Sequence, residues 1–489
     1  MMVLGLVLVV AGCGEKQVGF APGGVPDAGS ASPTMGEDAQ VGDAGVPDVG
    51  VPDVGPEPPP ASGDFTGLPT GRTQWALLCA RQHRDAISSK FCAGDAPPRV
   101  TSIAELETFL GLTIRAGVGG NADLVLTGMS TGLGIRRTTP LNPRAVVMTH
   151  VSELGLPNDP LEVISFGRGE PFVELVANDR DEQTLRFFAL RFNPACEFTA
   201  AGCNFADLLT PAFESGWLSY TLYDEETLKN TTVDCLVCHQ PAGPGTQKIL
   251  RMQELVAFWD HWFDAGYPGL APFHAAHGTE SYAGFPSAEL ASPGPGILYR
   301  SSPAALQNLM LNNGFAQPNA FDSPTINDEL LATGVSPTWQ ALYAKAVAGL
   351  EIPPPYFAQL QTDPAKVAAM VTAYQQVMAG TMPREQLPDI RDTLLDAALP
   401  DMSIRPKRGL DGRGILVHMC AMCHDSRLDP TLSRARFNVE QLDAMPREEK
   451  DLAIARLRLD DSDIHKMPPV RLHVLVDAER DLAIQELAR

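Results

Sequence analysis

One short motif, present twice, constrains this chain more than any other feature. The pattern Cys-x-x-Cys-His runs from Cys235 to His239 and again from Cys420 to His424. At this spacing both thiols can add across the vinyl groups of one porphyrin while the adjacent imidazole reaches its iron. Cysteine is scarce, with nine among 489 residues, so chance does not account for two copies. The sequence therefore predicts two covalently attached haem c groups. Their attachment residues would be Cys235, Cys238, Cys420 and Cys423, and their first iron ligands His239 and His424.

Two other uses of paired cysteines fit the sequence less well. A zinc ion held by both pairs normally has them about 15 to 20 residues apart, whereas the length of a domain separates these two pairs. A thioredoxin-like dithiol needs one pair beside a β-α-β pattern, which neither copy has. Neither use explains why a histidine follows both pairs.

The chain begins with an apolar segment that ends at a cysteine. Residues 3–11 are too few to span a bilayer as a helix, and small residues lead directly to Cys13. This segment resembles the lipobox of bacterial lipoproteins, in which cleavage would leave Cys13 as a lipid-modified first residue. The resemblance implies export and a lipid anchor in the cell envelope, and Gly14 after Cys13 favours the outer membrane over the inner one. Removal by an ordinary signal peptidase stays an alternative, but it gives Cys13 no role.

A repetitive segment follows the anchor. Residues 14–65 repeat a Val-Pro-Asp-small-Gly unit at 25–29, 46–50 and 51–55. Such a segment cannot bury enough apolar surface to offset its ordering entropy, and its prolines keep it extended. We expect a disordered stalk between the anchor and the folded body. Its acidic residues contribute to the formal net charge of -22, which argues against nucleic acid as a partner.

Four cysteines remain after lipid and haem have taken the other five. In an exported protein, four spare thiols most simply form two disulfides. Proximity in the sequence favours Cys79 with Cys92 and Cys196 with Cys203, although other pairings stay open. In a reducing compartment all four would remain thiols.

The periodicity of the body changes before the first motif. Residues 73–112 have a helical pattern, with Ser102 and Glu105 as a capping box. Apolar runs of strand length then occur between about 124 and 198, and the last two flank a turn-rich Asn-Asp-Arg-Asp sequence, as expected of a hairpin. We therefore predict an antiparallel sheet, whose strands include residues 145–148, 161–164, 172–176 and 185–192.

The second motif lies within a longer ordered pattern. A helical segment leads into Cys420, and a helical stretch at 439–459 precedes Met467. This arrangement resembles class I cytochromes c over about residues 405–489. The resemblance implies an all-α domain in which Met467 is the second axial ligand of the iron. A thioether opposite an imidazole favours ferrous iron and raises the potential. Met445 is the rival to Met467.

The second axial ligand of the first haem is less constrained. Met252 follows His239 by 13 residues, and at about 3.3 Å per extended residue that chain can reach the opposite haem face. We favour Met252. The alternatives are His261, His274 and His277, which would lower the potential relative to a methionine.

Basic residues cluster just before the second motif. They could pair with haem propionates or an acidic partner, or form a solvated basic face. These residues are Arg405, Lys407, Arg408 and Arg413.

Together these patterns predict an α+β protein with a mixed domain built on an antiparallel sheet, helical haem regions and an all-α C-terminal domain. The expected divisions are a lipoprotein signal peptide (1–13), the stalk (14–65), the mixed domain (66–225), the first haem region (226–400) and the cytochrome c-like domain (401–489).

The corresponding function is that of an exported, membrane-anchored dihaem c-type cytochrome, which carries electrons between redox partner proteins in the periplasm or at the outer membrane. The alternative is an enzyme similar to dihaem cytochrome c peroxidases, in which one haem opens to peroxide while the other supplies electrons. A third possibility is a binding protein in which haem acts as a sensor or a folding staple.

Overall fold

The computed structural model describes part of the chain, and the account below concerns that part. The described residues are 58, 63–112, 121–127, 137–139, 141–142, 144–149, 161–240, 243–250, 344, 348, 362–401, 404–421, 423–426, 428, 430–470 and 472–489. Cys13, nearly all of the stalk, Met252, His261, His274 and His277 lie outside them. Within these ranges no helix has the length and apolar character needed to cross a membrane.

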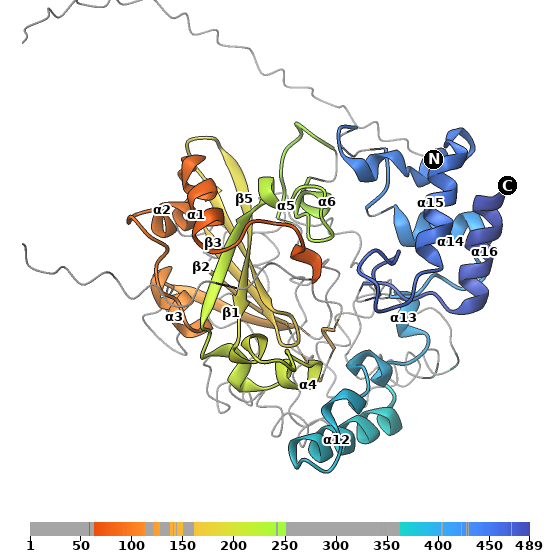
Figure 1. The fold of residues 1–489 in the computed structure, drawn as a ribbon, viewed down its shortest axis with the longest axis horizontal. Helices are drawn as coiled ribbons and strands as arrows, with labels where there is room; N and C mark the ends of the chain where they lie inside the picture. The colour runs from red at the N-terminus through yellow and green to blue at the C-terminus, as the bar shows by residue number, and fades with distance from the viewer. Residues whose placement is uncertain are drawn as a thin grey trace, which may run out of the picture. The chain divides into compact units, whose positions relative to one another are not determined.

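Six antiparallel strands form one sheet, and each strand is hydrogen-bonded to the next one in the sequence (Figure 1). The prediction of a mixed α+β fold with an antiparallel sheet is confirmed. The strands are β1 (Ala122–Thr127), β2 (Arg144–Thr149), β3 (Glu162–Gly167), β4 (Phe172–Asp179), β5 (Thr184–Asn193) and β6 (Ser219–Asp224).

The four apolar runs identified in the sequence correspond to β2, β3, β4 and β5. The predicted hairpin is the β4–β5 pair, in register from Phe172 opposite Arg191 to Asp179 opposite Thr184. Every residue of β3 and the last eight of β5 are buried, which means that both faces of the sheet are covered here. Sequence analysis did not predict β6, in which polar and apolar residues alternate.

Three helices precede the sheet: α1 (Gly71–Ala80), α2 (Ala86–Phe91) and α3 (Ile103–Phe109). α1 packs against β6, and α2 packs against β4. The Ser102 side chain caps α3 by accepting from the Glu105 amide, as predicted. The Glu105 carboxylate reaches back one residue further than expected and accepts from the Thr101 amide at 2.7 Å.

The two predicted disulfides are confirmed. Cys79 near the end of α1 bridges to Cys92 directly after α2, which ties these helices together. Cys196 bridges to Cys203 in the segment between β5 and β6. Both bridges join residues that are close in sequence, which is why proximity was a sufficient guide to the pairing.

Short helical segments lie before α1 and again after β5 and β6, up to the first motif. They are η1 (Gly63–Phe65) before α1, then η2 (Ala195–Phe198), α4 (Phe205–Leu208), η3 (Pro211–Glu214), α5 (Glu225–Leu228) and α6 (Leu236–His239). Further on lie α12 (Pro364–Met378), η9 (Arg384–Gln386), η10 (Ile390–Thr393) and α13 (Ala398–Asp401).

The C-terminal residues form a helical group with its own apolar core. It contains α14 (Gly412–Cys420), η11 (Ser433–Arg436), η12 (Val439–Ala444), α15 (Arg447–Leu457) and α16 (Asp477–Ala488) (Figure 1). α16 packs against both α14 and α15. The core joins apolar side chains from all three helices, including Ile415, Leu457 and Leu487.

Candidate functional site

The first motif begins at the N-terminus of a short helix. Cys235 is the N-cap of α6, and the helix ends at His239. The Asp234 carboxylate accepts from the Leu236 amide at 2.9 Å, which satisfies a backbone donor that a helix start leaves without a partner in the helix. Asp234 therefore holds the two-cysteine segment in place.

The His239 ring is held by the loop that follows it. Its Nδ1 lies 3.0 Å from the carbonyl oxygen of Ile249, and the Ile249 amide donates to the His239 carbonyl at 2.8 Å. A histidine that ligates a metal usually donates its other ring N–H to such an oxygen, which fixes the tautomer and the ring orientation. In this arrangement Nε2 is the nitrogen available to bind a metal.

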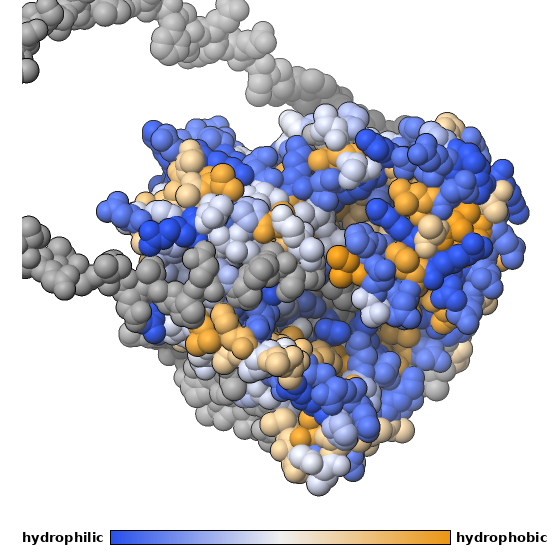
Figure 2. Space-filling model, viewed as in Figure 1, coloured by the Kyte–Doolittle hydropathy of each residue, from blue (hydrophilic) through white to orange (hydrophobic). Residues whose placement is uncertain are grey.

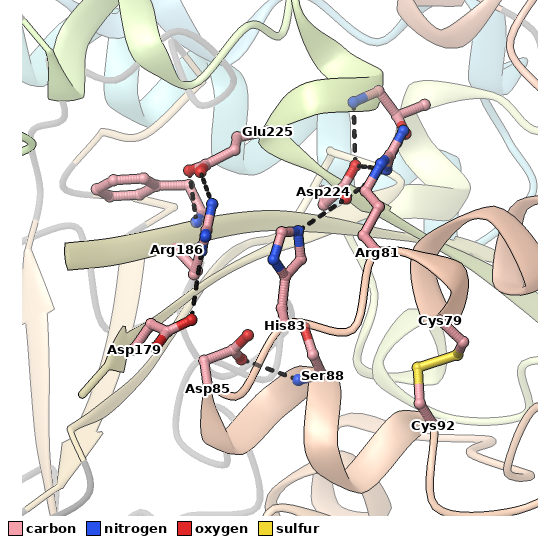
Figure 3. A network of polar contacts seen from close by, with 12 residues as sticks. Cys79, Arg81, His83, Asp85, Ser88, Cys92, Asp179, Arg186, Asp224 and Glu225 are labelled. Carbon is pink, nitrogen blue, oxygen red and sulfur yellow. Dashed lines mark hydrogen bonds and ion pairs between the residues drawn. A yellow bond between two sulfur atoms is a disulfide. The ribbon is translucent and has the colours of Figure 1, made fainter. Parts of the chain in front are cut away.

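The sheet supports the other side of the same imidazole. Phe187 of β5 stacks on the His239 ring, with centroids 4.1 Å apart and planes 19° from parallel. Glu225 accepts from the Phe187 amide at 3.1 Å and pairs with Arg186 (Figure 3). Glu225 also pairs with Lys248. No role for the β region could be predicted from the sequence, and the structure shows that β5 packs against the first motif.

The second motif repeats this arrangement. α14 runs into Cys420, and His424 Nδ1 lies 2.9 Å from the carbonyl oxygen of Arg434. In both motifs the accepting carbonyl comes ten residues after the histidine. Burial lowers the pKa of His424, which favours the neutral imidazole that can bind a metal.

A cavity of about 470 Å³ opens beside the second motif, within the range of cofactor sites. Cys420, Cys423 and His424 line it together with Met467. The lining also includes apolar residues, such as Leu416, Met419 and Leu457, and three basic ones, Arg434, Arg436 and Arg456. Polar residues, among them Ser433 and the acidic Glu449, complete it. The donor set and the apolar wall fit a porphyrin that carries acidic side groups.

One buried hydrogen-bond donor supports the fit of a porphyrin to this cavity. Arg434 Nε is buried and, among the described residues, has no hydrogen-bond partner. Guanidinium donors match carboxylates well, so a haem propionate would supply an acceptor. Of the four basic residues singled out from the sequence, two have acidic partners elsewhere: Arg405 pairs with Glu479, and Arg413 pairs with Asp443.

The two candidate methionines occupy different environments. Met445 is buried in the apolar core of the C-terminal helices, next to residues such as Leu442. Met467 lines the cavity. His473 lines the same cavity and is buried. Sequence analysis did not single out His473, because nothing in its local sequence marks it as a ligand.

The four motif cysteines differ from the other described cysteines. None of the four is in a disulfide, whereas the remaining four described cysteines are bridged. Burial raises the pKa of Cys235 and raises that of Cys420 to about 12. Redox-active dithiols depend instead on a lowered thiol pKa.

Apolar side chains are exposed around this group of helices. Figure 2 shows hydrophobic surface over the C-terminal helices, where the exposed apolar residues include Val417, Leu452 and Leu482. Leu452 also lines the cavity.

A second polar cluster lies at the sheet. Ligand atoms of His83, Asp179 and Glu182 lie within 4.8 Å of one another. However, Arg186 lies 3.7 Å from Asp179 (Figure 3). Arg186 also pairs with Glu182. Arg186 thus contacts both acidic groups of the cluster, which is best described as an ion network in which the two carboxylates share one cation.

No family model matches this chain, and no curated protein or solved structure is significantly similar to it. The function is therefore argued from the two motifs and their surroundings alone.

Proposed function

We propose that this protein is a dihaem c-type cytochrome that carries electrons between redox partner proteins. The observation that carries the proposal is the repeated geometry of the proximal histidines. In each motif, Nδ1 faces a backbone carbonyl ten residues downstream, which orients Nε2 for iron. Two unrelated local sequences, Gln-Lys-Ile and Leu-Ser-Arg, provide the same support.

The residues of the two motifs would have separate roles in holding the haems. Cys235, Cys238, Cys420 and Cys423 would attach the two haems, and His239 and His424 would be the proximal ligands. Each haem, when bound, supplies one-electron redox chemistry. The chain supplies ligation, burial and orientation, and Phe187 limits rotation of the His239 ring.

The C-terminal domain is proposed to be a cytochrome c-like all-α domain. Three features support this: α14 leads directly into the motif, α16 packs across α14, and Met467 lies on the cavity wall. We favour Met467 as the second axial ligand at this site. For the first site we retain Met252, which lies outside the described residues.

The proposed location is the bacterial cell envelope, with a lipid anchor at Cys13 and the outer membrane favoured. The two disulfides support an oxidising compartment, because such bonds are rare in the cytosol. Attachment through Cys13 would leave the folded part beside the membrane, where it can meet its redox partners.

Optical and electron paramagnetic resonance spectra of the matured protein test this function. An electron carrier should show two low-spin haems that are reduced and reoxidised reversibly in one-electron steps. One high-spin haem together with peroxide-dependent turnover would instead support the peroxidase-like enzyme. Haems that show no reversible redox step would contradict the carrier.

A further inference from the structure

We propose that the ion pair between Asp234 and Arg434 couples the two haem sites electrostatically, so that its charges set both midpoint potentials. This inference rests on the proposed function, because it requires both haems. The pair joins residues 200 positions apart in the sequence, and each partner is bound to a different motif.

Asp234 adjoins the first motif. It directly precedes Cys235, and its Oδ1 accepts from the Leu236 amide at 2.9 Å. Its Oδ2 accepts from the Asn230 amide at 2.8 Å and from the Arg434 guanidinium. The side chain is only 1% exposed, so its charge depends on these partners.

Arg434 supports the histidine of the second motif. Its carbonyl oxygen holds His424 Nδ1 at 2.9 Å, and its side chain lines the cavity beside Cys420 and Cys423. It also lines a smaller cavity along α6, together with Val237. One guanidinium therefore borders both the second motif's cavity and the helix of the first motif.

Other contacts hold the two motifs together at this point. Val237 and Leu472 form a small buried apolar cluster, and Cys238 and Cys423 pack against it. Asn230 Nδ2 donates to Ser433 Oγ at 2.8 Å. Residues 230–232 also line the cavity of the second motif. One cysteine of each motif thus contacts the same apolar cluster.

The electrostatic consequence follows from burial. Charges that are shielded from water interact more strongly than exposed ones. A positive charge that has lost its counterion disfavours ferric iron nearby, which raises the midpoint potential. A lone negative charge has the opposite effect. Because the pair borders both sites, removal of either partner should move both potentials.

The test is a spectroscopic redox titration of the haem-loaded full chain. Asp234→Asn should raise both midpoint potentials, because Arg434 loses its counterion. Arg434→Gln should lower both midpoint potentials, because Asp234 loses its counterion. In the double variant the two shifts should largely cancel. Arg413→Gln is the matched control, because its pair with Asp443 is in the same group of helices but exposed.

The opposite signs of the two potential shifts distinguish electrostatic coupling from simple loosening of the fold. Loosening would shift the midpoint potentials of both variants in the same direction. Arg434→Gln leaves a buried carboxylate unpaired and could fail to mature. Asp234→Asn and the double variant then decide the outcome. Shifts confined to one haem, shifts of equal sign, or shifts no larger than those of Arg413→Gln would overturn the inference. The wild-type haem content separates this result from failure of the proposed function.

Discussion

Gly412 in α14 lies directly against the backbone of Leu482 in α16. A Cβ atom at Gly412 would be 2.2 Å from the Leu482 carbonyl oxygen, a distance that real Cβ atoms do not reach. Glycine therefore allows the two helices to approach closely. This contact positions α14, and with it Cys420 at the end of that helix.

Replacing Gly412 with alanine should force the two helices apart. Overpacking of this kind typically costs about 1 to 3 kcal/mol, and we expect the unfolding midpoint to fall accordingly. Thermal unfolding of the haem-loaded protein would measure the effect. Gly94→Ala is the control, because its nearest neighbour would be 3.8 Å from the new Cβ. Equal midpoints for the two variants would contradict the close contact.

Removal of the second attachment site should leave the chain with one covalently bound haem. In a Cys420→Ser, Cys423→Ser double variant we expect the covalent haem content to fall from two per chain to one, as measured by pyridine haemochrome and intact mass. Cys196→Ser breaks a disulfide instead and should keep both haems. A double variant that still carries two covalent haems would show that Cys420 and Cys423 do not attach haem.

Met467→Ala should remove the methionine ligand of the second haem. The methionine-to-iron charge-transfer band of that haem should disappear, and its potential should fall, because ferrous iron loses a soft ligand. Met445→Leu changes a core methionine of the same domain and should leave the band intact. A band of unchanged intensity in Met467→Ala would exclude Met467 as the ligand at the second haem, because the first haem, with Met252 as its ligand, accounts for only part of the wild-type intensity.

Glu107 should make stability depend on pH. Burial, and secondarily the charge of Glu214, raises the pKa of Glu107 from 4.5 to about 8. Between these values the folded state binds more protons than the unfolded state, so stability falls as the pH rises. This group gives its full stabilisation below about pH 4.5 and loses it as the pH approaches 8.

Replacing Glu107 with glutamine should therefore stabilise the protein at pH 8 relative to wild type, by on the order of 3 kcal/mol. The difference should shrink towards pH 5. Chemical unfolding at several pH values would measure it, and Glu448→Gln, at an exposed position, should not show this trend. A stabilisation that is the same at every pH would contradict the raised pKa of Glu107.

Features that depend on neighbouring residues could be predicted from the sequence. The Cys79–Cys92 bridge spans 13 residues, and the β4–β5 hairpin joins adjacent strands. The Ser102 cap acts within one turn of helix. In each case local propensity and local packing favour the same structure, so no distant contact is needed to specify it.

Features that depend on distant residues could not be predicted. Phe187 stacks on His239, and Arg434 pairs with Asp234 across 200 positions, but no periodicity or motif marks either pair. The same applies to His473, which the fold brings to the cavity of Met467. Such contacts arise from tertiary packing, and no local pattern in a single sequence indicates them.

Intact-mass measurement of the matured protein, with a pyridine haemochrome assay beside it, decides whether both motifs carry haem. We expect a mass increase that corresponds to two haems, and a haemochrome spectrum typical of thioether-linked haem in a ratio of two per chain. A chain matured by a competent c-type haem ligation system that carries no covalent haem, or only one, would contradict the account.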